Sequence, residues 1–170
     1  AVCDSVSYVL SDSTIKLLGD PIMWSEENEM SADSVDLFIK NQQLHSMFMR
    51  PNSFMVSQVD SIRYNQIKGT EMRGFFKDRE LRLIRVKGNG QTIYYAQDEL
   101  ERFVGVNRAE SSDINIRLAN QEIQGITFIS DVESSVYPLG ELDPKSELRF
   151  KGFQWRVERR PKSKADLFQK

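Results

Sequence analysis

The 170-residue chain has a single cysteine and a single histidine. One cysteine excludes an intrachain disulfide and a zinc site made of several cysteines. One histidine, His45, makes a Ser-His-Asp triad or a multi-histidine metal site a poor hypothesis. An excess of either charge is also missing, because 23 Lys+Arg are balanced by 25 Asp+Glu, whereas nucleic-acid-binding domains usually carry a cationic excess. The composition therefore predicts no metal, no cofactor and no nucleic-acid partner, and it weakens most enzyme hypotheses.

Long hydrophobic runs are missing too. No stretch approaches the ~18 apolar residues of a membrane-spanning helix. Residues 1–10 lack the basic start and apolar run of a signal peptide, so the protein is either cytosolic or a mature or trimmed chain. With 39% hydrophobic and 28% charged residues, the composition is that of a folded chain.

Alternation of apolar and polar residues is the dominant pattern, and its period of two is typical of half-buried strands. Three alternating runs each lead into a short polar segment with Asn or Asp, which predicts a tight hairpin turn. These pairs are 35–40 with 40–43, 72–77 with 77–80, and 114–118 with 119–122. Helical periodicity is weak except at 98–103, where one helical turn is expected. The chain is predicted to be nearly all β.

The three hairpins are copies of one unit. Setting Asn28, Asn65 and Asn107 in register aligns the following residues without a gap, and apolar character recurs at equivalent positions on both sides of each turn. We predict a single domain over 1–170, with repeat units at about 28–57, 65–95 and 107–137 and a C-terminal cap at about 145–170.

Such a short unit cannot bury its own apolar face, so neighbouring units must stack and share one elongated core. Each unit closes with Asn52, Asn89 or Asp131 and continues into another apolar strand. The step from Leu44 to Met47 breaks the alternation, and a bulge after the turn would restore the inward face. The prediction is a rolled or folded sheet whose open ends expose unpaired strand edges.

The sequence resembles the OstA-like/LptA family of lipopolysaccharide-transport proteins, and its Bacteroidetes branch in particular, over about residues 15–168. The resemblance rests on the order of a Gly-containing turn, an apolar strand and a strand start with Ala-Asp. The segments that carry it are 18–24 (LGDPIMW) with 28–35 (NEMSADSV), 64–76 (YNQIKGTEMRGFF), 88–95 (GNGQTIYY), and 150–155 (FKGFQW) with 160–162 (RPK).

This resemblance implies a β-taco, a V-shaped β-jelly-roll of repeated antiparallel hairpins with open ends. It implies a periplasmic protein that carries lipid A acyl chains in an apolar trough. The expected partners are lipopolysaccharide, other lipopolysaccharide-transport proteins at the inner and outer membranes, and further copies of the chain joined end to end by strand pairing. No enzymatic activity is expected.

The recurring apolar positions form the predicted groove set. Its members are Val35, Leu37, Ile39, Leu44, Met47, Met49, Met72, Phe76, Leu81, Ile84, Val86, Ile114, Ile116, Leu118, Ile123, Ile126 and Phe128. A closed core and a lipid groove both need this inward aliphatic face. On the residues alone, a closed core explains the set better than a lipid groove does. The family resemblance brings the two interpretations level.

Other candidate residues favour structural roles. The glycines do not open a helix before Lys-Ser/Thr, as a phosphate loop would, so turns and bulges are predicted. An acid pair among Asp33, Asp36 and Asp60 is disfavoured, since Asp33 aligns with Thr70 in the next unit. His45 is expected on the surface.

The C-terminal tail interleaves basic and aromatic residues from Arg149 onward. Phe150, Phe153 and Trp155 are expected to cover the final strand, with a solvated end beyond them. A lipid phosphate contact through Arg149, Lys151 and Arg156 is the second interpretation, and single-stranded nucleic acid is a third.

Two other functions stay open. A structural or adhesive repeat module without a ligand needs the same apolar face. A carbohydrate-active β-solenoid enzyme needs clustered carboxylates or a base at equivalent positions, and here those positions change chemistry between copies.

Overall fold

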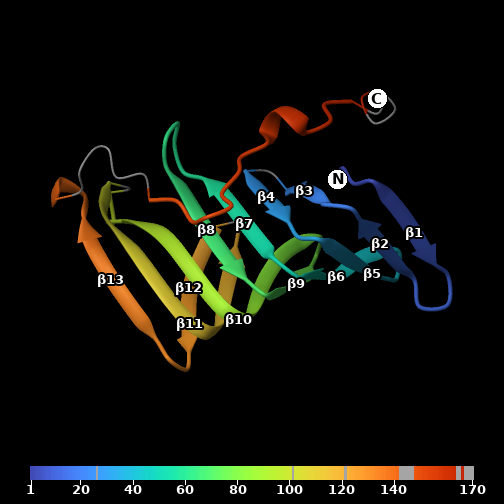
Figure 1. Cartoon of the computed structure of the whole chain (residues 1–170), viewed down its shortest axis with the longest axis horizontal. Coiled ribbons are helices and arrows are strands. Elements are labelled where there is room, and N and C mark those ends of the chain that lie inside the picture. Colours follow the sequence, from blue (N-terminus) through green and yellow to red (C-terminus); the bar gives the residue numbers. More distant parts are fainter. Residues whose placement is uncertain (26, 101, 121, 142–147, 164–165, 167–170) are drawn as a thin grey trace.

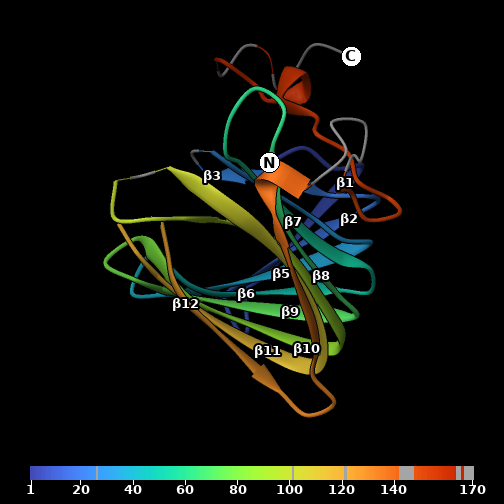
Figure 2. The same ribbon diagram turned by 90° about the vertical axis from the view of Figure 1, so that its left-hand side faces the viewer.

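The chain folds into one large antiparallel sheet that is curled into a trough with two walls (Figures 1 and 2). The computed structural model describes residues 1–25, 27–100, 102–120, 122–141, 148–163 and 166. The predicted all-β fold, an open and curled sheet of antiparallel hairpins, is confirmed. Among the described residues, no helix is long and apolar enough to cross a membrane.

Wall A holds the hairpins that the alternation predicts. Its strands in spatial order are β1 (Ser5–Val9), β2 (Thr14–Leu18), β5 (Ser34–Lys40), β6 (Gln43–Arg50), β9 (Glu71–Lys77), the first half of β10 (Glu80–Gln97), the second half of β11 (Phe103–Ala119) and β12 (Glu122–Ile129).

Wall B holds the strands that connect one wall A hairpin to the next. They are β3 (Ile22–Ser25), β4 (Asn28–Ser31), β7 (Ser53–Gln58), β8 (Tyr64–Gly69), the second half of β10, the first half of β11 and β13 (Glu133–Pro138). Two short 3-10 helices, η1 (Leu139–Glu141) and η2 (Val157–Arg159), follow.

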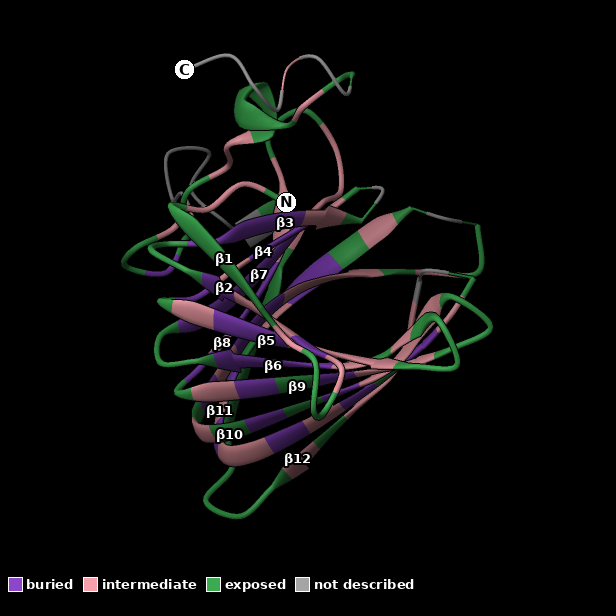
Figure 3. Cartoon of the chain, turned by 90° about the vertical axis from the view of Figure 1, so that its right-hand side faces the viewer, coloured by how far each residue is buried: buried purple, intermediate pink, exposed green. Residues whose placement is uncertain are grey.

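The walls meet along an apex, where the chain turns from one wall into the other. Asn52, Asn89 and Asp131 stand at these corners with φ of 57°, 51° and 50°. Asn and Asp tolerate this left-handed conformation better than most residues, which explains why the aligned units all close with one of the two. Figure 3 shows the buried residues concentrated where the walls meet, and the exposed hairpin turns where they part.

Small residues allow the walls to approach at the apex. A Cβ placed on Gly69 would lie 2.2 Å from Cγ1 of Val86, and one placed on Gly90 would lie 2.7 Å from Cγ1 of Ile114. A side chain at Gly69 or Gly90 would therefore push the walls apart.

The predicted hairpin turns and bulges of wall A are present. Asn41 with Gln42, and Asp78 with Arg79, have positive φ at both central positions, as in two-residue hairpin turns. The third turn includes residue 121, which is outside the described residues. Each hairpin has a register shift close to its turn, between Phe38 and Ile39 in the first, with counterparts in the others. The predicted bulge thus restores the inward face.

Candidate functional site: the trough

Equivalent positions of the aligned units lie in register across the inner face of wall A. We call such a row of paired residues a rung. The rung nearest the apex contains Leu17, Val35, Met49, Met72, Val86, Ile114 and Phe128. The next contains Ile15, Leu37, Met47, Gly74, Ile84, Ile116 and Ile126. The remaining groove residues form the pairs Ile39–Leu44, Phe76–Leu81 and Leu118–Ile123 near the hairpin turns. Every member of the predicted groove set belongs to wall A.

Depth divides this groove set. Near the apex, Val35, Met49, Met72 and Ile114 are 0% exposed, because they pack against methionines of wall B. The partly exposed members farther from the apex are Leu37, Ile39, Leu44, Phe76, Leu81, Ile123 and Ile126. Phe128 is also partly exposed although it lies in the apex rung, because β12 is an edge strand. The deep part of the trough is therefore a sealed core. The open part is an apolar strip along the lip of wall A, by which we mean the edge of the wall that carries the hairpin turns, opposite the apex.

The inner face of wall B completes the trough and is absent from the predicted groove set. Met23, Met30, Met55 and Ile67 are buried there and belong to the same core as wall A. The sequence did contain a signal for these wall B residues, namely the apolar strand that follows each closing Asn or Asp. Met55 lies in the first of these strands, after Asn52.

Closer to its lip, the inner face of wall B becomes polar. We call this rung the amide row, and its described members include Asn28, Ser57, Asn65, Tyr94 and Asn107. Ser57 Oγ donates to Asn28 Oδ1. The backbone N–H of Tyr95 donates to Asn65 Oδ1 at 2.9 Å, next to the point where the β8–β10 pairing ends. The residues that set the three copies in register thus line the trough at its mouth.

A cavity of about 550 Å³ opens between the two lips. Leu118 and Ile123 line it from wall A, and Asn28, Asn65 and Tyr94 line it from wall B. Its volume lies in the range of about 300–1,000 Å³ that is usual for small-ligand sites. Apart from Asn120 at the hairpin turn, the wall A side of this mouth is apolar, whereas the wall B strands offer hydrogen bonds through Asn28 and Asn65.

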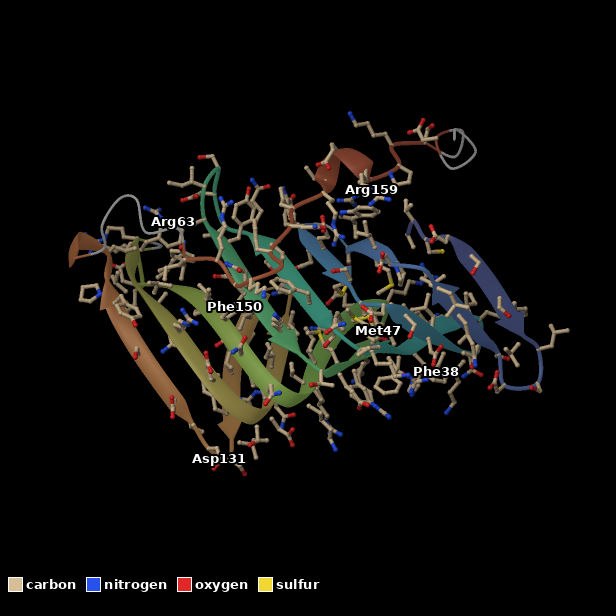
Figure 4. All side chains as sticks on the ribbon, viewed as in Figure 1. Phe38, Met47, Arg63, Asp131, Phe150 and Arg159 are labelled. Atoms are coloured by element: carbon tan, nitrogen blue, oxygen red, sulfur yellow. The ribbon has the colours of Figure 1, made fainter. Side chains whose placement is uncertain are left out.

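The outer face of wall B is covered by residues 148–156, which we call the strap. In Figures 1 and 4 it runs from the β13 end of the molecule across β8 and β7, with Phe150 lying on it. Phe150 is 6% exposed and packs in a second core with Val56, Ile93 and Val106. The side-chain oxygen of Gln66 accepts the N–H of Phe150, and its amide nitrogen donates to the carbonyl of Leu148, both at 2.9 Å. Gln66 is buried without losing its hydrogen bonds, as a buried amide requires.

A buried carboxylate holds the far end of the strap. Glu29 is 2% exposed, and it accepts the Trp24 indole N–H at 3.1 Å. It also accepts the backbone N–H of Arg156 at 2.7 Å and the guanidinium Nε–H of Arg156 at 2.8 Å. Several charge-assisted bonds compensate for the burial of this charge.

The strap corrects the prediction for the tail. The aromatic residues were expected to cover the final strand, but they cover the face of wall B, and β13 is exposed throughout. The cause is apolar area, because the outer face of β7 and β10 offers Val56 and Ile93 to pack against. Within the predicted cap, residues 145–147, 164–165 and 167–170 lie outside the described residues.

The predicted phosphate-contact residues are on the strap, on the side of wall B away from the trough. The Arg149 guanidinium lies 4.7 Å from the Phe153 ring centroid. The carbonyl of Lys151 accepts from Lys68 Nζ at 3.1 Å, and Arg156 is paired with Glu29. These residues are not brought together with the groove set, so a phosphate that they contacted would lie outside the trough.

The other candidates are separate from one another. Asp33 accepts from the Asn52 amide at 3.1 Å, and Asp36 pairs with Arg50 at 2.9 Å. Asp60 lies in the loop between β7 and β8. His45 is exposed, as predicted. In the part of the chain that the structure describes, no three His, Cys, Asp or Glu residues are grouped to hold a metal.

Aspartates organise the lip loops of wall B. Burial acts to raise the pKa of Asp60, but hydrogen bonds from the Ile62 and Arg63 N–H groups and the Arg63 guanidinium outweigh it, so this pKa lies below the ordinary 3.8. Hydrogen bonds from the side chain and backbone of Arg102 likewise lower the pKa of Asp98. The helical turn predicted at 98–103 is wrong, because the described residues form a loop around Asp98, whose carboxylate accepts the N–H groups of Leu100 and Arg102.

No protein-family model matches the sequence, and no curated protein matches it either. Solved structures do resemble it. One is the crystal structure of LptH, the LptA homologous periplasmic component of the conserved lipopolysaccharide transport device from Pseudomonas aeruginosa. The two structures superpose with a TM-score of 0.59, covering 81% of this chain and 93% of that chain at 11% sequence identity. The chain has an LptH-like fold. The resemblance inferred from the sequence is thereby confirmed for the fold, and the trough described above is the concave face of an LptA-type sheet.

Proposed function

We propose that this chain is a non-enzymatic lipopolysaccharide-transport protein that holds lipid A acyl chains at the mouth of its trough. The LptH-like fold supports this proposal, since LptH is a periplasmic component of a lipopolysaccharide transport device. The observation that carries it is the half-exposed apolar strip along the lip of wall A, beside the cavity of about 550 Å³. Each methylene buried there contributes about 0.8 kcal/mol. Several acyl carbons are therefore enough for useful affinity.

Photo-crosslinking tests this proposal directly. A photoreactive amino acid at Phe76 or Ile123 would sit in the open strip, at Ile116 in the sealed core, and at Arg117 on the outer face as a control. We expect lipopolysaccharide adducts at Phe76 and Ile123 and none at Arg117. A folded protein without adducts at Phe76 and Ile123 would contradict the carrier role and favour a structural module without a ligand. Adducts at Ile116 would show that the walls part to admit the chains.

We propose a periplasmic location and partners at the inner and outer membranes for the same reason. Edge strands at the two ends of each wall, β1 and β12 in wall A and β3 and β13 in wall B, support end-to-end pairing between copies. Sedimentation velocity across a concentration range checks this, and we expect the mean mass to rise with concentration. A constant monomer mass would contradict stacking of the chain on itself.

A further inference from the structure

The two sides of the trough mouth differ in chemistry, and this difference restricts what fits between them. Leu118 and Ile123 line the cavity from wall A, whereas Asn28 and Asn65 line it from wall B. A pure hydrocarbon would satisfy wall A, but it would desolvate the two amides without replacing their hydrogen bonds. The occupant therefore needs polar atoms on the side that faces wall B.

Hydrogen bonding within the amide row indicates which polar atoms these are. The Tyr95 N–H needs an acceptor, so the contact at 2.9 Å identifies the Asn65 oxygen and fixes the direction of that amide. Asn28 Oδ1 is occupied by the Ser57 hydroxyl. Among the described residues, the amide nitrogens of Asn28 and Asn65 have no hydrogen-bond partner. Each residue therefore offers N–H donors to the cavity, and a ligand must supply acceptors.

The asparagines of the amide row recur along the trough, every second strand. Asn28 pairs with Ser57 and Ser57 with Asn65, so the two amides stand two strands apart. Neighbouring strands are about 4.8 Å apart, which places the amides about 10 Å from one another. At the third equivalent position, the amide nitrogen of Asn107 donates a hydrogen bond to Ser134 Oγ at 2.8 Å. Among the described members of the amide row, the amide nitrogens without a hydrogen-bond partner thus belong to Asn28 and Asn65.

We propose that Asn28 and Asn65 bind the carbonyl oxygens of the ester or amide linkages that join acyl chains to the ligand's polar part. This inference rests on the proposed function and adds an orientation to it. The acyl chains lie along the apolar lip of wall A, while the linkage carbonyls face the amide row of wall B. The site thereby distinguishes an acylated amphiphile from a plain alkyl chain.

A matched pair of ligands isolates the carbonyl. Dodecanoylglycerol has one ester carbonyl, and dodecyl glyceryl ether has the same chain without it. Binding of both, and of lipopolysaccharide, is measured by displacement of a fluorescent alkyl probe from the full chain. We expect the wild type to prefer the ester by about twofold to tenfold, since a tenfold preference equals 1.4 kcal/mol and one hydrogen bond contributes about 0.5–1.5 kcal/mol.

Variants assign the preference to the amide row. Asn65→Leu and Asn28→Leu should each reduce the preference for the ester and weaken lipopolysaccharide binding several-fold, while affinity for the ether is unchanged or improved. Asn28→Leu covers the case in which loss of the Tyr95 contact unfolds Asn65→Leu. Asn115→Leu makes the same substitution on the outer face of wall A, in the rung with Arg85 and Thr127, and should behave as wild type.

The outcomes distinguish a failure of this inference from a failure of the proposed function. Equal binding of ester and ether by the wild type would overturn the role of the amides even if lipopolysaccharide still bound, and an unchanged preference in a folded Asn28→Leu would overturn the role of Asn28. A wild-type chain that binds none of the three ligands would overturn the proposed function together with this inference.

Discussion

Wall A and wall B come from the same repeated unit, yet within the described part of the chain only wall B is covered on its outer face. Wall A is apolar inside from apex to lip, and outside it presents arginines stacked on aromatic rings, such as Arg50 and Arg73 on Phe48. Wall B is packed on both faces at β7, β10 and β11, because the strap covers their outer side. The difference indicates that wall B is the supporting wall, whereas the inner lip of wall A is the surface left open for a ligand.

The largest effect is expected from a pair of phenylalanines that are equally exposed but packed against different kinds of side chain. Phe150 and Phe48 are both 6% exposed. Phe150 packs among the apolar side chains of the second core, so Phe150→Ala should lower the free energy of unfolding by about 3–5 kcal/mol. Phe48 is covered by arginine side chains that can relax toward water, so Phe48→Ala should cost about 1–2 kcal/mol. Urea unfolding of the two variants measures both values, and equal losses would contradict a covered wall B beside an open wall A.

The second comparison uses a carboxylate on the outer face of each wall. Glu29→Ala leaves Arg156 and the Trp24 indole without their acceptor under the strap, which should cost about 2–4 kcal/mol. Asp36→Ala removes one ion pair to Arg50, whose side chain is 46% exposed, and should cost under about 1 kcal/mol. Urea unfolding again gives the values. A loss for Asp36→Ala as large as that for Glu29→Ala would show that the strap does not set the difference.

Much of wall A could be predicted from the sequence, because most of its strands bury one face and therefore alternate, with a break at each bulge. The turns, the bulges and the groove set all follow from that alternation. Wall B could not be resolved in the same way. In β7 the run Phe54, Met55 and Val56 is buried on both faces, so alternation cannot tell which side chain enters the trough. The position of the strap was equally hidden, since no local pattern says which apolar face an irregular tail will cover.

The alignment of Asn28, Asn65 and Asn107 was found from the sequence, but its meaning was not. In the sequence, the three asparagines only mark equivalent positions of the copies, because a polar residue at a strand start is usually solvated. The structure places these residues at the mouth of the trough. Whether a polar rung faces a cavity depends on how the two walls are folded against each other, which a single strand's sequence does not encode.

A third and smaller effect tests the closeness of the walls at the apex. Gly69→Ala would put a methyl group 2.2 Å from Val86 Cγ1, and separating the walls to relieve that clash should cost about 1–3 kcal/mol. Gly125→Ala, on the outer face of wall A, meets only the end of the Arg117 side chain at 3.2 Å and should change stability by less than about 0.5 kcal/mol. Thermal unfolding of both variants provides the check. If Gly69→Ala were as stable as Gly125→Ala, the close contact between the walls at the apex would be contradicted.

The smallest expected effect concerns the lips, where the walls also differ. Wall A turns by two-residue hairpins, whereas the wall B loops are held by Asp60 and Asp98, whose pKa values lie below 3.8. A lowered pKa in the folded state means that the carboxylate stabilises its loop above the unfolded pKa, and that this contribution is lost as the pH falls through the folded pKa. Acidification below about pH 4 should therefore loosen the wall B loops before the wall A turns.

Titration of the carboxyl carbons by NMR measures this effect, and each loop serves as the control for the other. Arg63→Gln removes the guanidinium from Asp60 but keeps the bond from the residue 63 N–H, so the pKa of Asp60 should rise part of the way to its ordinary value. The same change should leave Asp98 unaffected. Arg102→Gln should do the reverse, with the larger share of the shift at Asp98, because the side-chain bond is its main cause. A change in either variant that moved both aspartates would mean that the two loops act as one unit, and the lip of wall B would then respond to acid as a whole.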